Sequence, residues 1–435
     1  MRTLGEWLTL QESAHPKSID MELTRVTRVA RALALDAPAF PVITVAGTNG
    51  KGSIVAHLEA LLGALGASTG MFTSPHLLRY HERIRVNGGE VGDAELIAAF
   101  ERIEAARGAT TLTFFEYNTL AALLVFVQRR VDVGLLEVGL GGRLDATNLV
   151  AADVAVLASV GFDHRDWLGD TLELIGAEKA GIFRAQRPAV LGTADMPPSV
   201  FATIAALGAH ALIAQRDFSW RLRAGGWDYD GLRVSLRGLP PSALAGSIQY
   251  RNAATAIAAV EALDCGAGSR AAARDLARGL APLAERTVGQ ALRAVRLAGR
   301  FQVVPGEVEW ILDIAHNAPA AEVLAMQLRE RPTPREGGRS FAVMGVLADK
   351  DAGAIAPSLA GVIDHWIVCT LPGARGRSAA QLAQCLGRAP REMTLAESVA
   401  AGCERAREAA QPGDRVVVFG SVHTVGPALE WLRIY

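Results

Sequence analysis

A glycine-rich turn near the N-terminus is the first part of this sequence that predicts chemistry. Residues 42–53 read VITVAGTNGKGS, so an apolar stretch leads through glycines and Lys51 into a segment of helical spacing. Glycines let backbone N–H groups crowd around a phosphate, and a helix N-terminus adds partial positive charge. The match to the Walker A motif is not strict: Val45 replaces its first glycine, and Gly52 separates Lys51 from Ser53. A glycine turn without a ligand is the alternative, but the full context predicts nucleoside triphosphate binding, with Lys51 reaching the β- and γ-phosphates.

A second glycine-rich turn presents two acids and an arginine. Residues 131–136 form a mostly apolar run that ends at Glu137, and the following VGLGGRLDATN carries Arg143 and Asp145. A carboxylate at the C-terminal end of a parallel strand lies where α/β folds bind ligands. Beside a triphosphate, Glu137 would hold Mg²⁺ directly or through water, because Mg²⁺ prefers oxygen ligands. Taken alone, Glu137 also fits a capping or solvated carboxylate.

Two more candidates follow the next apolar run. Residues 159–169, SVGFDHRDWLG, contain His164, and residues 178–184, EKAGIFR, contain Lys179. A lone histidine is more often structural than a metal ligand, and the preference of Mg²⁺ for oxygen counts further against His164. By itself, Lys179 also fits an ordinary lysine on a helix surface.

The strong preference for arginine over lysine makes the few lysines candidates for a specific chemical role. Of the 44 basic residues four are lysines and the other 40 are arginines. An amine can lose its proton, whereas a guanidinium cannot, so a lysine kept in this chain is a candidate for that chemistry. Chance survival is the alternative. The four lysines are Lys17, Lys51, Lys179 and Lys350.

Alternating elements must position these residues. Short apolar runs alternate with segments of helical spacing, which predicts an α/β fold of βα units around mostly parallel sheets. Apolar residues from Ile54 to Leu65 recur every three or four positions, as on one face of a helix. Residues 218–239 predict a small antiparallel insertion. Strands are predicted at Pro41–Ala46, Val131–Val138, Val154–Val160 and Pro188–Leu191, and near Val308–Ile314, Ser340–Val346, His365–Cys369 and Arg415–Phe419.

Length and composition bound the class of protein. The 435 residues are enough for two large domains, and half of them are apolar. We place the boundary after Ala298, giving an ATP-binding domain of residues 1–298 and a smaller Rossmann-like α/β domain of residues 299–435. A net charge of −1 predicts no nucleic-acid partner, and no apolar run is long enough to span a membrane. Four scattered cysteines and an N-terminus without a signal-like segment predict a cytoplasmic protein.

Together these segments resemble the Mur ligase superfamily and, within it, the bacterial family of bifunctional dihydrofolate synthase/folylpolyglutamate synthases. The resemblance runs nearly end to end. Its P-loop variant and the Glu137 segment mark the superfamily, whereas Ser18–Met21 and Thr113–Tyr117 are similar to the dihydropteroate-binding parts of the bifunctional type. The matching segments are Ser18–Met21, Gly47–Ser53, Thr73–Leu77, Thr113–Tyr117, Glu137–Asn148, Asp163–His164, Glu178–Arg184, Gly299–Phe301, Asp313–Asn317 and Gly420–Thr424.

The resemblance implies a Mur-ligase-like P-loop domain, ATP and two Mg²⁺ ions. It implies that Ser74, Glu137 and His164 bind one Mg²⁺, despite the low expectation for His164 alone. Lys179 resembles a carbamylated lysine whose carbamate helps to hold the second Mg²⁺. Lys51, His164, Lys179 and Arg300 would take part in catalysis. The implied ATP contacts are Thr48, Asn49, Gly50, Lys51, Gly52, Ser53, Asn252, Arg300 and Asp313.

The resemblance also implies a site for the pterin substrate. Two departures from the family pattern, Ala298 before Gly299 and Arg251 before Asn252, replace prolines and bear on hinge geometry rather than on the chemical groups. Lys350 and Ser421 stand where related ligases contact the incoming amino acid, a weaker transfer. The implied pterin-site residues are Ile19, Asp20, Met21, Thr113, Phe114, Phe115, Glu116, Leu144, Asp145 and Ala146.

The implied reaction is ATP-dependent ligation. ATP would convert a carboxylate into an acyl phosphate, and the amine of L-glutamate would then displace phosphate to form an amide. The expected acceptors are dihydropteroate and reduced folates, and the expected state is a monomer. The alternatives are a monofunctional folylpolyglutamate synthase, a Mur-type ligase for another acid, and a nucleotide-binding protein without ligase activity.

Overall fold

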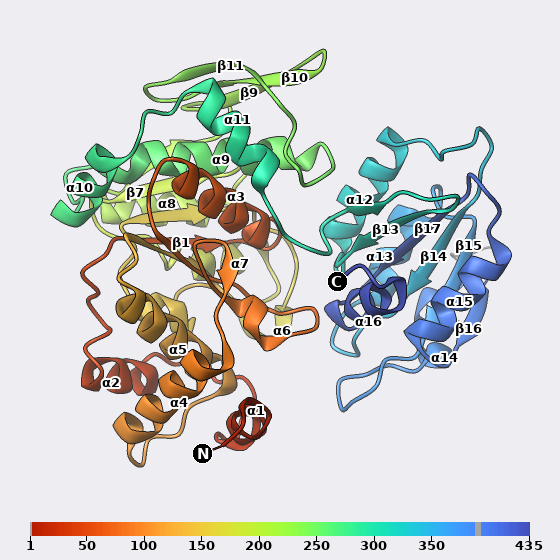
Figure 1. Ribbon diagram of the computed structural model, residues 1–435, viewed down its shortest axis with the longest axis horizontal. Coiled ribbons are helices and arrows are strands. Elements are labelled where there is room, and N and C mark those ends of the chain that lie inside the picture. The colour runs from red at the N-terminus through yellow and green to blue at the C-terminus, as the bar shows by residue number, and fades with distance from the viewer. Residues whose placement is uncertain (1, 388–392) are drawn as a thin grey trace. The chain divides into compact units, whose positions relative to one another are not determined.

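The protein consists of two compact units, each with its own sheet. The computed structural model describes residues 2–387 and 393–435 (Figure 1). The first unit comprises Met1–His76, Tyr80–Ala243 and Tyr250–Val295, and the second comprises Leu77–Arg79, Leu244–Gln249 and Arg296–Tyr435. The division after residue 295 differs slightly from the predicted boundary after residue 298. Two short segments from earlier in the chain also join the second unit.

The sheet of the first unit is mostly parallel, as predicted. Its order is β4-β3-β2-β5-β1-β6-β7-β8. The strands β2, β5, β1, β6, β7 and β8 run parallel to one another, whereas β3 and β4 pair antiparallel at one edge. The strands β2, β5, β1 and β6 are therefore consecutive in space, and their C-terminal ends lie along one edge. The strands are β1 (Val42–Ala46), β2 (Thr69–Phe72), β3 (Ile84–Val86), β4 (Gly89–Glu90), β5 (Val133–Glu137), β6 (Val154–Leu157), β7 (Pro188–Leu191) and β8 (His210–Ile213).

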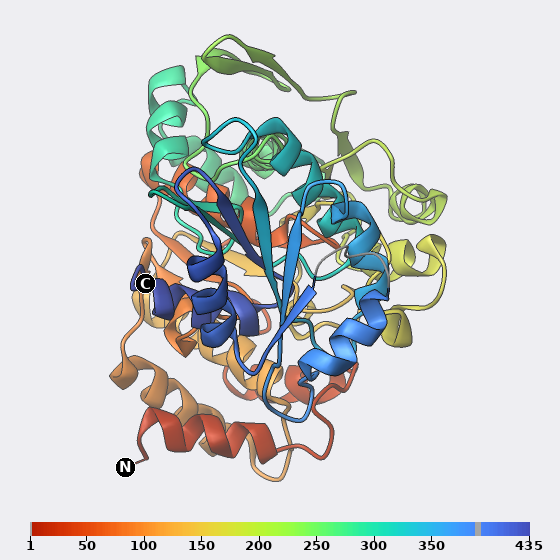
Figure 2. The ribbon, with the colours of Figure 1, turned by 90° about the vertical axis from the view of Figure 1, so that its right-hand side faces the viewer.

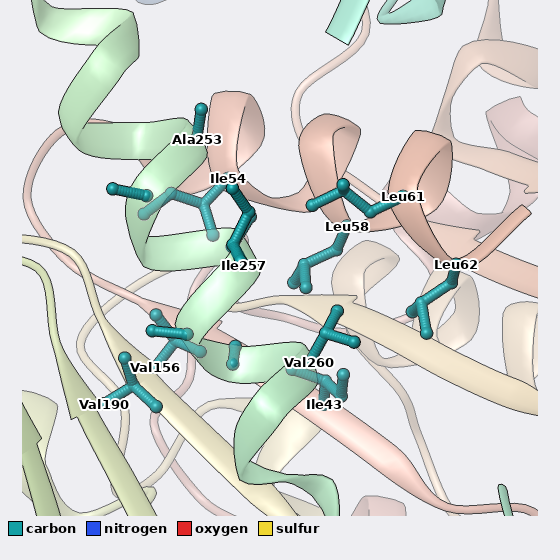
Figure 3. Close-up of a cluster of buried hydrophobic side chains, with 14 of the residues drawn as sticks. Ile43, Ile54, Leu58, Leu61, Leu62, Val156, Val190, Ala253, Ile257 and Val260 are labelled. Carbon is teal, nitrogen blue, oxygen red and sulfur yellow. The ribbon is translucent and has the colours of Figure 1, made fainter. Parts of the chain in front are cut away.

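Helices cover both faces of this sheet because its strands are apolar on both sides. On one face lie α3 (Lys51–Ala64), α9 (Ile248–Glu261) and α11 (Glu285–Ala294). Figure 3 shows Leu58 of α3 and Ile257 and Val260 of α9 in one buried cluster with Ile43 and Val156 of the strands. The other face is covered by α1 (Leu4–Ser13), α2 (Thr24–Ala32), α4 (Asp93–Arg107), α5 (Phe114–Arg129), α7 (Leu172–Ala180) and α8 (Pro198–Leu207).

The antiparallel insertion predicted at residues 218–239 is confirmed. Strands β9 (Ser219–Arg223), β10 (Gly226–Asp230) and β11 (Ser235–Leu239) form a separate sheet in the order β11-β10-β9. The buried Glu261 at the end of α9 accepts hydrogen bonds from the Tyr229 hydroxyl at 2.6 Å and the Arg233 N–H at 2.8 Å. These bonds fasten the insertion to the first unit.

The second unit is a Rossmann-like α/β layer structure, also as predicted (Figure 2). Its sheet has the order β12-β13-β17-β14-β15-β16, with β12 alone antiparallel to its neighbour among the strands of the described residues. Successive residues of β14 alternate between two helical layers: Ala342 and Met344 pack under α12, α13 and α14, and Phe341 and Val343 under α15 and α16. The strands are β12 (Gln302–Val304), β13 (Glu309–Asp313), β14 (Ser340–Met344), β15 (His365–Cys369), β16 (Met393–Ala396) and β17 (Arg415–Phe419), and the helices are α12 (Ala318–Glu330), α13 (Ala352–Leu359), α14 (Ala379–Leu386), α15 (Val399–Ala409) and α16 (Val422–Leu432).

All eight strands predicted from the sequence are present, most with slightly shorter bounds. The short strands β2, β3, β4, β8, β12 and β16 were not predicted. Within residues 2–387 and 393–435, no helix has the length and apolar character to cross a membrane.

Candidate active site

The predicted phosphate-binding turn joins β1 to α3. Gly50 caps the N-terminus of α3 with a φ of +89°, a left-handed conformation that favours glycine. Lys51 folds back over the turn, and its Nζ donates to the carbonyl oxygens of Gly47 at 2.9 Å and Thr48 at 3.3 Å. The ammonium therefore lies above the loop whose N–H groups would surround a phosphate. Asn252 of α9 is buried, and its Oδ1 lies 3.1 Å from the position of a Cβ on Gly50.

The turn is tied to the loop that follows β6. The Thr48 N–H donates to the Ser159 carbonyl at 2.9 Å, and the Asn49 N–H donates to Ser159 Oγ at 3.2 Å. Thr48 Oγ1 also donates to the Gly161 carbonyl at 3.0 Å and accepts from the Gly161 N–H at 2.9 Å. Ser159 and Gly161 were not predicted as site residues. Their position directly after a strand next to β1 is the signal that could have identified them.

The oxygen ligands predicted for Mg²⁺ lie on adjacent strands. Glu137 ends β5 with only 3% of its surface exposed, and the Ser74 N–H, just beyond β2, donates to Glu137 Oε2 at 3.2 Å. A buried carboxylate beside a serine supplies oxygen donors of the kind that Mg²⁺ prefers, so these two residues fit a magnesium ion. Among residues 2–387 and 393–435, no three His, Cys, Asp or Glu side chains gather as a metal site.

His164 has an unusual backbone conformation. It precedes α6 (Arg165–Leu168) with φ 51° and ψ 40°, in the left-handed region that residues other than glycine rarely adopt. Its N–H donates to Asp163 Oδ1 at 2.9 Å, and its Nε2 lies 3.9 Å from Asp163 Oδ2. Such conformations concentrate at functional sites. The loop reaches His164 only three residues after Gly161, which bonds to the phosphate-binding turn.

The glycine turn after Glu137 touches three predicted groups at once. A Cβ on Gly139 would lie 2.6 Å from the Phe115 ring, and one on Gly142 would lie 2.7 Å from the Lys179 carbonyl oxygen. A Cβ on Gly141 would lie 3.4 Å from Met21 Cε. A Cβ at Gly139 or Gly142 would collide with its neighbour, whereas Gly141 is favoured by its positive φ of 67°. Lys179 is 4% exposed near the end of α7, so it is not a surface lysine.

Asp145, in the same turn, fixes the path of the loop through its hydrogen bonds. Burial raises the pKa of Asp145, against the opposing effect of its hydrogen bonds. Asp145 Oδ1 accepts from the Thr147 N–H at 3.0 Å, and Oδ2 accepts from the Leu140 N–H at 2.9 Å. These bonds shape the chain around Leu144 and Ala146. Direct contact of these three residues with a pterin stays a prediction.

The remaining predicted pterin-site residues lie in two segments joined by ion pairs. Thr113 and Glu116 form a capping box at the start of α5, each bonding the other's N–H through its side chain. Glu116 Oε1 also accepts from Arg25, which in turn contacts Asp20. Arg25 was not predicted as a site residue, and no local motif marks it. Burial raises the pKa of Glu116, although Thr113 and Arg25 act in the opposite direction.

The other predicted ATP contacts belong to the second unit. Asp313 ends β13 and accepts from the N–H groups of Phe301 and Ala315, each at 2.8 Å. Burial raises the pKa of Asp313, and the positive charge of Arg300 opposes that effect. Ser421, one of two candidates for the amino-acid site, caps α16 through a bond from the His423 N–H at 3.1 Å. The roles of these residues stay predictions.

Family models match most of the chain. The Mur ligase middle domain matches residues 45–207, and the Mur ligase glutamate ligase domain matches residues 299–422. The first match contains the phosphate-binding turn, Glu137, His164 and Lys179, and the second contains Arg300 and Asp313.

Full-length relatives are also similar. The Escherichia coli (strain K12) protein named dihydrofolate synthase/folylpolyglutamate synthase is 41% identical over 429 residues, covering 98% of this chain and 95% of that protein. The structure of E. coli FolC in complex with DHPP and ADP is 40% identical, with a TM-score of 0.90, and covers 99% of this chain and 98% of its own. A bifunctional folylpolyglutamate synthase/dihydrofolate synthase with Mn, AMPPNP and L-glutamate bound has a TM-score of 0.87 and 40% identity, and covers 100% and 99% of the two chains.

Proposed function

This chain belongs to the family of bifunctional dihydrofolate synthase/folylpolyglutamate synthases among the Mur ligases, and from that premise we propose how its residues ligate glutamate to folates. It is an ATP-dependent ligase that uses a divalent metal ion. The pterin acid is dihydropteroate, and the incoming amine is that of L-glutamate. Extension of reduced folates by further glutamates is the second activity that we propose.

The observation that carries this proposal is the glycine turn at residues 139–142. It starts next to Glu137, on the side of the phosphate-binding turn, and it also packs against Phe115 and Met21 of the predicted pterin site. An acid and the γ-phosphate of ATP must meet within bonding distance for phosphoryl transfer. A single short turn bordering both sites supports that meeting.

In the first step, an oxygen of the acceptor carboxylate attacks the γ-phosphorus of ATP, and ADP leaves. The product is an acyl phosphate, a mixed anhydride far more electrophilic than the carboxylate. Lys51 offsets the charge that builds up on the transferring phosphoryl group, and we assign the same part to Arg300. A divalent ion held by Ser74 and Glu137 supplies further charge stabilisation when bound.

In the second step, the neutral amine of L-glutamate attacks the acyl carbon. The C–N bond forms, the C–O bond to phosphate breaks, and the nitrogen loses its proton. Water would compete for the acyl phosphate, so the low exposure of Glu137 and Lys179 fits a site that excludes it.

We also propose that Lys179 is carbamylated. Its neutral amine would add to CO₂ with loss of one proton, giving a carbamate whose oxygens suit a second Mg²⁺. The burial of Lys179 supports this assignment, because an ordinary lysine on a helix lies on its surface. We further expect His164 to complete the first ion site, and the protein to be monomeric and cytoplasmic.

Release of ADP tests the proposed reaction. Purified protein is incubated with Mg²⁺-ATP, dihydropteroate and L-glutamate, and each component is omitted in turn. We expect ADP only when the acceptor is present, and hydroxylamine in place of glutamate should trap the acyl phosphate as a hydroxamate. Rapid ADP release without any acceptor would contradict the proposal, and so would no release with all components.

A further inference from the structure

Arg25 joins the two segments of the predicted pterin site. Its Nη1 donates to Asp20 Oδ2 at 2.9 Å, and its Nη2 donates to Glu116 Oε1 at 3.2 Å. Nη2 also donates to the Asp20 carbonyl oxygen at 3.3 Å. Asp20 and Glu116 are far apart in sequence, so one guanidinium fixes the position of two separate stretches of chain.

The segment that Arg25 holds has little structure of its own. Residues 14–23, between α1 and α2, form neither helix nor strand. A second side chain, His15, bridges the same two stretches: its Nε2 lies 3.1 Å from Asp20 Oδ2 and its Nδ1 lies 2.8 Å from Thr111 Oγ1. Because no helix or strand contains these residues, the side-chain bonds help to define where Asp20 and Met21 lie.

The Arg25–Glu116 pair is shielded from solvent, whereas the other two carboxylates that accept from Arg25 are more exposed, Asp20 at 22% and Glu22 at 47%. The side chain of Arg25 is 14% exposed and that of Glu116 is 4% exposed. An ion pair this buried is costly to break from one side, because the remaining charge loses its partner in a poorly solvated place. This separates Arg25 from Arg31 on the same helix, whose side chain is 71% exposed and pairs with Asp36 at 3.3 Å.

We propose that Arg25 is a positioning residue for the pterin acceptor, which holds Asp20 and Met21 against the start of α5. Met21 then lies beside Gly141 while Phe115 covers Gly139, so the two segments border the same turn. The inference rests on the proposed function, because it needs these segments to bind the pterin. A lysine cannot replace Arg25 fully, since it lacks the planar fork that reaches two acceptors at once.

The test compares Arg25→Met, Arg25→Lys and the control Arg31→Met with the unchanged protein. Loss of a charged hydrogen-bond network should raise KM for dihydropteroate about tenfold or more in Arg25→Met. The change in KM for Mg²⁺-ATP should stay within about twofold, because Arg25 bonds to pterin-site segments and not to the phosphate-binding turn. Arg25→Lys should recover part of the loss, and Arg31→Met should match the unchanged protein. The affinities for dihydropteroate, measured at equilibrium in the presence of ADP, should rank the variants in the same order.

Folding is controlled separately. Arg25→Met leaves Glu116 buried without its cation, so the double variant Arg25→Met/Glu116→Gln removes the stranded charge and keeps the capping side chain. It should fold and bind dihydropteroate more weakly than the single variant Glu116→Gln, which is the reference because Glu116 is itself a predicted pterin-site residue. Unchanged dihydropteroate affinity in folded Arg25 variants would overturn the proposal, as would an equal loss of affinity for ATP. If the unchanged protein does not glutamylate dihydropteroate, the proposed function itself is wrong. This reaction is measured before any variant is made, so failure of the proposed function is distinguished from failure of the proposal for Arg25.

Discussion

The Thr48 hydroxyl and the Gly161 backbone exchange two hydrogen bonds, at 3.0 and 2.9 Å. Thr48 belongs to the phosphate-binding turn after β1, and Gly161 belongs to the loop after β6 that leads to His164. Together with the bonds of Ser159, the Thr48 side chain thus links the predicted phosphate site to the loop that leads to one of the predicted metal ligands.

Loss of that hydroxyl should impair ATP use. Thr48→Val keeps the shape of the side chain but leaves the Gly161 N–H and carbonyl groups without this partner, which costs about 1–3 kcal/mol when the groups are buried. We expect kcat/KM for ATP to fall about 10- to 100-fold, while Thr48→Ser stays within about threefold of the unchanged protein. A Thr48→Val enzyme with normal ATP kinetics would show that the link has no role in the site.

Glu137 should control the metal requirement. Glu137→Gln retains an oxygen that can accept from the Ser74 N–H but removes the negative charge that attracts the ion. We expect kcat to fall about 1000-fold, as expected for loss of several kcal/mol of charge stabilisation. Titration with Mg²⁺ should show half-maximal activity at a much higher concentration. If activity and metal dependence stay the same, the ion is bound elsewhere.

The ligase activity should depend on the amine of Lys179 rather than on its positive charge. Lys179→Arg keeps a cation but cannot form a carbamate, so we expect loss of most ligase activity with little change in ATP affinity. Lys179→Ala should recover in part when short-chain carboxylic acids are added, because they can supply the missing oxygens. Carbon-13 bicarbonate should give a carbamate NMR signal in the unchanged protein and none in Lys179→Arg. Full activity of the arginine variant would exclude the carbamate role.

The buried His57 predicts how stability depends on pH. Its Nδ1 lies 2.7 Å from the Ser53 carbonyl oxygen and its Nε2 lies 2.9 Å from Ser242 Oγ, so Nδ1 carries the proton and Nε2 accepts. Burial lowers its pKa from 6.5 to about 4, with the bond to Ser53 acting in the opposite direction. The unfolded chain therefore binds a proton that the folded chain does not, and stability is lost as the pH falls from 6.5 towards 4.

The measurement compares unfolding of the first unit in the unchanged protein and in His57→Gln, which cannot titrate there. The advantage of histidine over glutamine in unfolding free energy should shrink by about 3 kcal/mol between neutral pH and pH near 4. Other titrating groups cancel in the comparison. A constant difference across this range would mean that His57 is not held neutral.

Much of the fold could be predicted from the sequence because its strands are short apolar runs between helical patterns. The unpredicted β3 and β4 are the opposite case: Ile84–Val86 contains an arginine, and Gly89–Glu90 is exposed and carries no apolar pattern. The strand β16, Met393–Ala396, lies at a sheet edge with a short and weakly apolar sequence. Edge strands are paired and covered on fewer sides, so their sequences carry less of the signal.

The candidate site, too, could be predicted only in part. Motifs identified the segments that end at or follow central strands, because parallel strands bring their C-terminal ends together. They could not identify Arg25, whose bond to Glu116 joins segments far apart in the sequence. Nor could they foresee that Asp145 is used within its own loop, since that depends on the local path of the turn. Long-range side-chain bonds of this kind leave no periodic pattern in a sequence.

The mass of the products tests the central claim most directly. Purified protein is given Mg²⁺-ATP and L-glutamate with dihydropteroate in one reaction and tetrahydrofolate in another. The account predicts addition of one glutamate to dihydropteroate and of one or more to tetrahydrofolate, each with matching formation of ADP. Addition to tetrahydrofolate alone would contradict the acceptor site assigned to residues 19–21 and 113–116. No addition to either acceptor would contradict the account as a whole.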